Sequence, residues 1–272
     1  MFRPEMNMDR LNKSAARLAL PEFNHEELLQ CIKQLVRLEK DWIPEGRGYS
    51  LYIRPTMIAT NECIGISQPD RALLYVICSP VGPYFQSSGF SAVKLLAEDS
   101  FVRAWPGGTG EYKIGANYGP TILPQRLAMA RDCQQILWLL GPEHEITEIG
   151  SMNCFILLRD SRGNLELVTP PLDNGTILPG VTRASILELL RSEGQFKVSE
   201  RSINMAELLE AHGQGRIVEM FGSGTAAIVS PIKCINYHGK DYEIPLNPQK
   251  PEKQAGPLAE RLFQTITQIQ VK

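Results

Sequence analysis

One glycine-rich run of the sequence contains the residue types that covalent amine chemistry requires. Lys113 lies between Trp105 and Gly119 in the run Trp-Pro-Gly-Gly-Thr-Gly-Glu-Tyr-Lys-Ile-Gly-Ala-Asn-Tyr-Gly, and Arg103 precedes it. Glycines lack a Cβ atom, so the backbone of such a run can approach a ligand closely. A lysine that is sheltered from water loses its proton readily and can form a Schiff base with an aldehyde. Taken alone, the run is more typical of a surface loop with a solvated lysine.

Glu148 is a candidate for the acid that would hold a protonated pyridine nitrogen. A pyridoxal phosphate enzyme needs a lysine for the aldehyde, a carboxylate beside the ring nitrogen and donors for the phosphate. Glu148 lies in the mostly apolar segment 145–158, where an unpaired carboxylate would be costly. The alternative is a strand residue that faces the solvent, and the alternation of residue types does not exclude it.

Two short turns could bind a phosphate. The first, Leu178–Arg183, passes through Pro-Gly into a predicted helix that begins at Val181, and backbone N–H groups at a helix start bind anions. The second, Gly222–Ala226, is a turn of small residues with hydroxyl and N–H donors. Taken singly, each is typical of an ordinary glycine turn.

The segment 50–59 could form part of a binding face. Tyr52 and Arg54 alternate there with Leu51 and Ile53, so on a strand the two polar side chains would point to the same side. By itself, the pattern indicates only an exposed strand.

The composition indicates a folded protein that lacks a basic surface for binding polyanions such as nucleic acids. The 272 residues are 43% hydrophobic, and 28 basic against 30 acidic residues give a formal net charge of −2. This length is enough for two domains. Because the basic residues form no cluster, we expect no nucleic-acid partner. No apolar run is long enough to span a bilayer, so we expect no membrane partner.

The cysteines and histidines give no sign of a disulfide scaffold or a metal site. The six cysteines are scattered without a Cys-x-x-Cys pair, which suits a reducing compartment. The four histidines are far apart in the sequence and lack the spacing of metal ligands. We therefore expect no bound metal.

The pattern of apolar residues predicts a mixed α+β fold rather than a regular β-α-β series. Helices are predicted over 5–20, 24–40, 127–133, 181–193, 204–212 and 256–268. Strands are predicted over 50–59, 72–79, 135–140, 145–158, 165–169, 217–221 and 226–232. The stretch 80–92, rich in Pro, Gly and Ser, is the best linker candidate. It predicts a domain of residues 1–81, a connection over 82–92 and a domain of residues 93–272.

The order and spacing of several motifs resemble those of class IV aminotransferases, which are fold type IV pyridoxal phosphate enzymes. The signature comprises Glu148–Phe155, Leu167–Thr169 and Leu178–Arg183. Further runs resemble the eukaryotic branched-chain amino acid aminotransferases across essentially the whole chain: Phe2–Pro4 with Asn7–Arg10, Ser50–Pro55, Val102–Trp105, Lys113 with Asn117–Gly119, and Phe221–Ala226. The resemblance implies a two-domain α+β fold like that of D-amino acid aminotransferase, with the site in the cleft between a small and a large cofactor-binding domain.

The resemblance also implies roles for individual residues. Lys113 would form the Schiff base with pyridoxal 5'-phosphate and carry the proton between the substrate α-carbon and the cofactor. Tyr118 would hydrogen-bond the phenolic oxygen of the cofactor, and Glu148 would pair with its pyridine nitrogen. The residues implied around the phosphate are Arg10, Arg103, Val181, Thr182 and Thr225. Those implied on the substrate side are Tyr52, Arg54, Thr225 and Ala226.

The reaction implied is reversible transfer of the α-amino group of leucine, isoleucine or valine to 2-oxoglutarate. Branched-chain amino acids and 2-oxo acids are then the expected partners, and the resemblance implies a homodimer. A D-amino acid aminotransferase or an aminodeoxychorismate lyase is disfavoured by the Arg-Pro…Asn-Met-Asp-Arg and Leu-Tyr-Ile-Arg runs. The alternative from another class is a non-catalytic or weakly active truncated paralogue or isoform that binds the cofactor or a full-length partner.

The sequence departs from the family pattern at three places. Ser151 stands where mammalian members usually have threonine, which keeps a hydroxyl. Ala227 and Ser230 stand at the positions of the mammalian redox Cys-x-x-Cys pair, so we expect that thiol switch to be absent. The family's first strands have no counterpart before Met1, so we expect a small domain that is incomplete at its N-terminus and a chain that is less active alone. Without a targeting segment, the expected location is cytoplasmic or mitochondrial.

Overall fold

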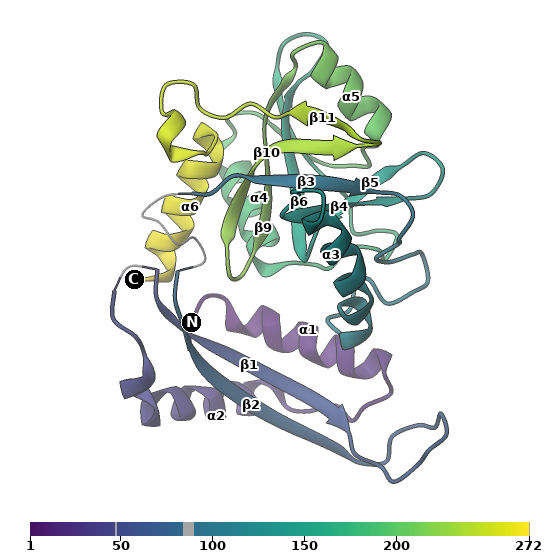
Figure 1. The fold of residues 1–272 in the computed structure, drawn as a ribbon. Coiled ribbons are helices and arrows are strands. Elements are labelled where there is room, and N and C mark those ends of the chain that lie inside the picture. The colour runs from purple at the N-terminus through teal and green to yellow at the C-terminus, as the bar shows by residue number, and fades with distance from the viewer. Residues whose placement is uncertain (47, 84–89, 272) are drawn as a thin grey trace. The chain divides into compact units, whose positions relative to one another are not determined.

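The structure is a computed structural model that describes residues 1–46, 48–83 and 90–271. It divides into two compact units, Met1–Gln86 and Ser87–Lys272 (Figure 1). The boundary falls inside the predicted connection 82–92, of which residues 84–89 lie outside the described residues. Each unit has a hydrophobic core of its own.

The first unit packs two helices against one face of a β-hairpin. Its elements are α1 (Pro4–Arg17), α2 (His25–Leu38), a 3-10 turn (Lys40–Trp42), β1 (Ser50–Ala59) and β2 (Ala72–Val81). Met8, Leu29 and Ile32 form the core. Ile53 and Val76 pack against it from the same face of the antiparallel hairpin, so this is the face that the helices cover.

The start of α2 follows from its capping residue. The Asn24 side chain accepts hydrogen bonds from Glu26 N at 3.0 Å and Glu27 N at 3.1 Å. Such a cap satisfies donors that the first turn of a helix leaves open. The predicted helix over 24–40 and the two predicted strands of this unit are confirmed.

The second unit is built on a nine-stranded mixed sheet. The strand order is β11-β10-β3-β4-β5-β6-β7-β8, and β9 pairs with both β10 and β6. The strands β3, β4, β5, β6, β9 and β10 therefore form a closed ring of pairings. In that ring, β3 runs parallel to β10 and β4, and the other pairs are antiparallel. The bounds are β3 Val93–Glu98, β4 Gln135–Leu140, β5 Glu145–Ile149, β6 Met152–Arg159, β7 Leu165–Thr169, β8 Lys197–Glu200, β9 Ile217–Gly224, β10 Ile228–Tyr237 and β11 Lys240–Glu243.

Four α-helices accompany the sheet among the described residues. They are α3 (Ile122–Met129), α4 (Val181–Glu193), α5 (Met205–Gly213) and α6 (Pro257–Gln270), and 3-10 turns cover Gly115–Asn117, Gly119–Thr121 and Pro251–Lys253. The larger core joins the ring strands to α5 through side chains such as Ile146, Met220 and Leu208. A smaller core joins α3 to β3 and β4 through Ala128 and Ile136. In this part of the chain the predicted helices over 181–193, 204–212 and 256–268 are confirmed.

Two elements that the sequence predicts in the second unit have the wrong residue bounds. The predicted strand 145–158 is two antiparallel strands, because Gly150 has a φ of 56° and forms with Ser151 the turn between β5 and β6. The predicted helix 127–133 covers Ile122–Met129 instead. It cannot continue through Asp132, whose φ of 55° lies in the left-handed region.

The strands at the predicted turn 222–225 also differ from the prediction. β9 continues through Ser223 to Gly224, and β10 begins at Ile228 and runs on to Tyr237. The short strands β3, β8 and β11 were not predicted, because pairing with their neighbours defines them more than their own residue pattern does. Within the described ranges, none of the helices has both the length and the apolar character that crossing a membrane requires.

Candidate active site

A buried asparagine fixes the loop that carries Lys113. The Asn117 amide donates to the carbonyl oxygens of Thr109 and Tyr112, each at 2.7 Å, and its Oδ1 accepts from the Thr109 hydroxyl at 2.8 Å. The Asn117 side chain belongs to a residue that is only 4% exposed, so these bonds are shielded from water. Three hydrogen bonds thus hold the backbone on the N-terminal side of Lys113.

The same loop rests against a neighbouring segment at a glycine. A Cβ atom on Gly110 would lie 2.5 Å from Ala104 Cβ and 2.7 Å from the carbonyl oxygen of Thr176. Only glycine allows so close an approach. The Thr176 carbonyl also accepts a hydrogen bond from Arg103 Nη1 at 3.0 Å. The segment that contains Thr176 therefore positions both the loop and Arg103.

Lys113 and Tyr118 are close enough to act on one bound group. Lys113 Nζ donates to Tyr118 Oη at 2.9 Å and lies 4.9 Å from the centroid of the tyrosine ring. Lys113 is exposed and Tyr118 is half-buried, so the amine can be reached by a small molecule. The 3-10 turn Gly115–Asn117 lies between these two residues and brings together the pair that the sequence predicts.

Glu148 is buried beside Arg103. Its Oε2 lies 2.8 Å from Arg103 Nε, and its Oε1 accepts hydrogen bonds from Leu178 N at 2.9 Å and Asn153 Nδ2 at 3.2 Å. Burial raises the pKa of Glu148 to about 7, although the Arg103 guanidinium opposes that rise. The Lys113 ammonium acts in the same direction as Arg103. The amine of Lys113 is therefore within electrostatic range of this carboxyl group.

One oxygen of Glu148 makes no hydrogen bond. Oε2 is buried, and although Arg103 Nε lies at ion-pair distance, the pair lacks hydrogen-bond geometry. Buried polar atoms nearly always have a hydrogen-bond partner. This oxygen can therefore accept from a donor on a ligand, and a protonated pyridine nitrogen is such a donor. The site fits a pyridoxal ring on this observation.

The start of α4 offers backbone donors that no side chain caps. Gly180 is the N-cap residue, and no side chain bonds the first turn. Val181 and Thr182 begin the helix and are 7% and 6% exposed. An uncapped helix start attracts anions such as phosphate. A Cβ atom on Gly180 would overlap Asn153 Oδ1, so this helix start touches the asparagine that also bonds Glu148.

The turn from β9 to β10 presents two of the predicted residues. Thr225 and Ala226 are exposed at its tip, since Gly224 pairs with Ile228 across the turn. Ile228 has a φ of 58°, which is rare for a β-branched residue. Such strain occurs mainly where surrounding structure holds the backbone in place. We therefore expect the surrounding structure to hold the backbone of this turn in place.

A row of opposed residues connects this turn to Glu148. On neighbouring strands, Glu148 is opposite Asn153, and Asn153 is opposite Ser223. Side chains of directly opposed residues share one face of a sheet. Ser223 is 1% exposed and its hydroxyl has no hydrogen-bond partner. The row therefore contains two buried oxygen atoms that can accept or donate to a ligand.

Arg10, Tyr52 and Arg54 belong to the first unit. Arg10, on α1, donates from Nη2 to Asn7 Oδ1 at 3.1 Å, one helical turn earlier. The Arg54 guanidinium carbon lies 5.2 Å from the centroid of the Tyr52 ring, so these two side chains share a face of β1 as their alternation predicts. The contacts above connect Arg103, Lys113 and Glu148 to the start of α4, and they lie within the second unit.

Sequence reasoning missed two asparagines that organise this site. Asn117 and Asn153 lie inside the recognised motifs, but neither received a role. The signal for Asn153 is the one that singled out Glu148, a polar side chain in a mostly apolar segment. Asn117 has no such signal, because its environment depends on how the loop folds.

Residues 1–235 match the family Amino-transferase class IV. Relatives include a branched-chain-amino-acid aminotransferase of Dictyostelium discoideum, 51% identical over 99% of this chain and 70% of its own length. The cytosolic enzyme of that name from Saccharomyces cerevisiae is 54% identical over 99% of this chain and 72% of its own length. The mitochondrial enzyme from Mus musculus is 52% identical over 93% of this chain and 64% of its own length.

Solved structures show the same fold. The branched-chain amino acid aminotransferase of Escherichia coli is 25% identical, with a TM-score of 0.76 over 98% of this chain and 79% of that one. The enzyme of Thermobaculum terrenum, solved in its pyridoxal phosphate form, is 24% identical with a TM-score of 0.74 over 98% of this chain and 78% of that one. The predicted α+β fold of type IV is confirmed. The chain belongs to the class IV aminotransferase family.

Proposed function

We propose that this chain is a branched-chain amino acid transaminase, which transfers the α-amino group of leucine, isoleucine or valine to 2-oxoglutarate. Three relatives that are 51%, 54% and 52% identical carry that name. One observation supports the chemistry most strongly. Glu148 Oε2 is buried without a hydrogen bond, in electrostatic range of Lys113.

Lys113 is the proposed attachment point and proton carrier. Pyridoxal phosphate, the cofactor of this family, supplies an aldehyde that takes up the amino group and a ring that withdraws electrons. Tyr118 Oη at 2.9 Å from Lys113 Nζ orients the amine and can exchange a proton with it. Because the amine must move a proton between two atoms, its exposed position on a fixed loop suits the role.

Glu148 is proposed to accept a hydrogen bond from the pyridine nitrogen through Oε2. The Leu178 N–H and the Asn153 amide hold its other oxygen, which fixes the direction of the free one. Arg103 favours the ionised carboxyl group. A carboxylate held in this way would keep the ring nitrogen of the bound cofactor protonated.

The phosphate and substrate contacts follow the same proposal. The N–H groups of Val181 and Thr182 at the uncapped start of α4, together with Arg10, Arg103 and Thr225, are proposed to bind the phosphate. Tyr52, Arg54 and the exposed Thr225–Ala226 tip are proposed to contact the substrate. Residues 1–81 would then belong to the small domain, 82–92 to the connection and 93–272 to the cofactor-binding domain.

A homodimer is part of the proposal. The face of the hairpin that carries Tyr52 and Arg54 also carries Ile58, Leu73 and Ile77, according to the strand register. These three apolar residues are 43%, 50% and 49% exposed. Apolar side chains gathered on one exposed face are typical of protein interfaces, and a second copy of this chain would cover them. Light scattering with size-exclusion chromatography would measure the mass in solution.

A non-catalytic role is not favoured, because Lys113, Tyr118 and Glu148 are all present and relatives of about half identity are aminotransferases. Since the relatives include cytosolic and mitochondrial enzymes, the proposal is compatible with either compartment.

Replacement of the lysine tests the function. Lys113→Ala should abolish the visible absorption band that forms with pyridoxal phosphate and essentially all transfer from leucine to 2-oxoglutarate. Lys197→Ala is the matched control, because that side chain is 71% exposed on β8, and it should keep both signals. Full turnover in Lys113→Ala would contradict the assignment. An intact lysine-dependent band without transfer from any branched-chain amino acid would contradict the substrate class.

A further inference from the structure

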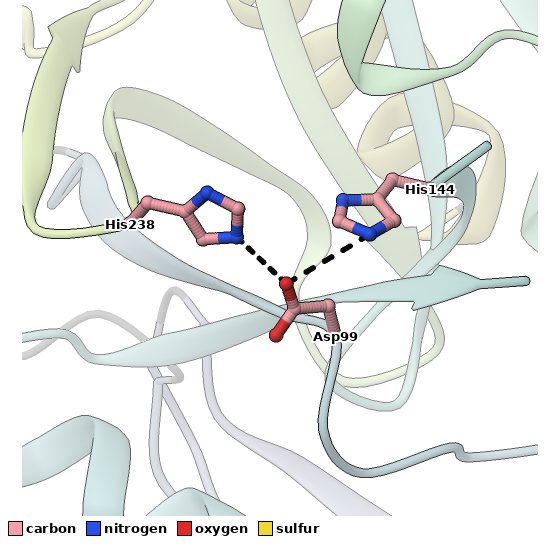
Figure 2. A group of neighbouring side chains, drawn as sticks. All are labelled: Asp99, His144 and His238. Carbon is pink, nitrogen blue, oxygen red and sulfur yellow. Dashed lines mark hydrogen bonds and ion pairs between the residues drawn. The ribbon is translucent and has the colours of Figure 1, made fainter. Parts of the chain in front are cut away.

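Asp99, His144 and His238 come from distant parts of the sequence and meet at one place in the second unit (Figure 2). Asp99 follows β3, His144 precedes β5, and His238 lies in the turn from β10 to β11. One ligand atom of each residue lies within 4.8 Å of the other two. His238 Nε2 is 2.7 Å and His144 Nε2 is 3.9 Å from the same atom, Asp99 Oδ2.

We propose that these three side chains bind a divalent transition-metal ion of the Zn²⁺ class. Two imidazole nitrogens and one carboxylate oxygen form a ligand set that Zn²⁺ uses, at about 2.0–2.2 Å. Around a tetrahedral ion, ligand atoms at such distances lie about 3.4 Å apart. The observed separations of 2.7 Å and 3.9 Å lie on either side of that value. A rotation of the His238 ring would lengthen the shorter separation toward that value, the His144 ring would have to move closer to Asp99, and water would complete the coordination.

The side chains around the cluster orient its ligand atoms. His144 Nδ1 lies 2.6 Å from Tyr237 Oη. When Nδ1 carries the proton, His144 Nε2 presents its lone pair toward Asp99. Asp99 Oδ1 accepts from the Ser100 hydroxyl at 3.3 Å, and its Oδ2 faces the two imidazoles. Tyr237 also stacks on the His238 ring at 4.0 Å. Hydrogen bonds of this kind to the far side of a ligand are typical of protein metal sites.

The turn that holds His238 does not by itself call for a histidine. His238 and Gly239 form a two-residue turn with φ values of 50° and 79° between Tyr237 and Lys240. Asn and Gly suit such a turn best, because both of its residues have positive φ. His144 has a φ of 50° as well. Residues in sparsely populated backbone conformations cluster at ligand sites.

The cluster is separate from the residues proposed to hold the cofactor, and the inference does not depend on the proposed function. Glu145, next to His144, and Glu148 are three residues apart on β5, which is about 10 Å of strand. The exposed fractions of the Asp99, His144 and His238 side chains are 30%, 26% and 59%, so an ion and its water ligands can enter from the solvent. The ion would join the ends of three strands of the sheet.

Metal titration of the holoenzyme tests the proposal. Protein freed of metal by a chelator and of unbound cofactor by gel filtration is titrated with Zn²⁺ in a calorimeter, and its thermal midpoint is measured with and without Zn²⁺. The wild type should bind one Zn²⁺ per chain at this site and melt at a higher temperature with it. His238→Asn keeps a residue that suits the turn but removes the imidazole. It should weaken the affinity by at least about 100-fold, more than loss of a supporting hydrogen bond does.

Two variants test the source of Zn²⁺ binding. One shows whether other histidines bind the ion, and the other shows how much the hydrogen bond that supports the cluster contributes. His25→Ala is the matched control, because His25 Nδ1 lies 2.8 Å from Asp9 Oδ1 in an exposed His–Asp pair. It should bind Zn²⁺ like the wild type. Tyr237→Phe removes the bond to His144 and should weaken binding by about tenfold. The same affinity in the wild type and in His238→Asn would overturn the proposal.

Thiols are the competing ligands and need their own test. Cys31 and Cys63 are exposed, and cysteine sulfur binds Zn²⁺ well. The double variant Cys31→Ser/Cys63→Ser should keep the stoichiometry and the affinity. Electron paramagnetic resonance of the protein with one equivalent of Cu²⁺ should show coupling to two imidazole nitrogens, which His144→Ala should reduce to one. Loss of binding in the double cysteine variant, or a spectrum without imidazole coupling, would overturn the proposal.

Discussion

Two carboxyl groups on strands that flank β6 differ in the pKa that their surroundings give them, and one of them belongs to the proposed cofactor site. Glu148 on β5 and Glu166 on β7 each lie beside an arginine, at 2.8 Å from Arg103 and 3.3 Å from Arg201. Burial raises the pKa of Glu148 to about 7. Burial acts on Glu166 in the same direction, but hydrogen bonds from Lys197, Ser199 and Arg201 outweigh it and lower the pKa to about 2.

The difference lies in how completely each carboxyl group is bonded. Glu166 accepts a hydrogen bond from the Ser199 hydroxyl and pairs with two cations at the edge of the sheet. Both of its carboxyl oxygens therefore have partners. Glu148 keeps one buried oxygen without a hydrogen bond. A buried charge that its own chain leaves incompletely bonded costs stability. Such a cost is expected where a ligand completes the bonding.

The largest effect should come from removal of Arg103, and removal of Arg201 is the comparison. Arg103→Leu leaves Glu148 buried without its cation and should destabilise the protein by about 3–5 kcal/mol. Arg201→Leu removes the Arg201–Glu207 pair but leaves Glu166 its partners Lys197 and Ser199, so it should cost less than Arg103→Leu. Urea unfolding followed by circular dichroism measures both. Equal losses for the two variants would show that the completeness of bonding does not distinguish these sites.

The next contrast is in the turnover rates of variants at the two carboxyl groups. Glu148→Gln removes the charge that would hold the protonated ring and should lower kcat by about 100-fold, with little change in KM. Glu166→Gln is the matched change outside the proposed site and should leave kcat close to that of the wild type. Steady-state kinetics with leucine and 2-oxoglutarate give both constants. A raised KM with unchanged kcat in Glu148→Gln would rule out the electronic role.

The third contrast is an opposite dependence of stability on pH in protein freed of cofactor. Folded Glu148 keeps its proton from its ordinary pKa of 4.5 up to about 7, so its contribution to the free energy of unfolding falls as pH rises through that window. Folded Glu166 loses its proton at about 2, so its contribution rises between about pH 2 and 4.5 and is lost again on acidification.

The unfolding midpoint in urea, measured against pH, checks this prediction. Relative to the wild type, Glu148→Gln should remove a decline between about pH 4.5 and 7, and Glu166→Gln should remove a rise below about pH 4.5. Difference curves of the same sign for both variants would contradict the opposite pKa shifts.

Elements with local signals could be predicted from the sequence. α4 begins at Val181 as expected, because Pro-Gly precedes an apolar helical pattern, and Asn204 caps α5 through Glu207 N at 2.9 Å. The motifs that carry Lys113 and Glu148 were found through their resemblance to class IV aminotransferases, because each run taken alone is typical of a surface loop or an exposed strand.

Features that depend on strand pairing could not be predicted. Asp99 and His238 meet because β3 pairs with β10, and the histidines, far apart in the sequence, gave no metal-ligand spacing. Asn117 is buried only because the loop folds around it. The division of segment 145–158 depends on two residues, Gly150 and Ser151, whose turn interrupts an apolar pattern that continues on both sides.

That two-residue connection sets a limit on insertions and deletions. Glu148 and Asn153 are opposed across it, and a strand shifted by one residue turns every side chain to the opposite face. An inserted or deleted residue there that shifts the register of β5 against β6 would turn the carboxyl group away from Arg103. The turn over residues 160–164 between β6 and β7 lies at a solvent-exposed edge, where added length is tolerated. Natural variation in loop length should therefore be more frequent at the second turn than at the first.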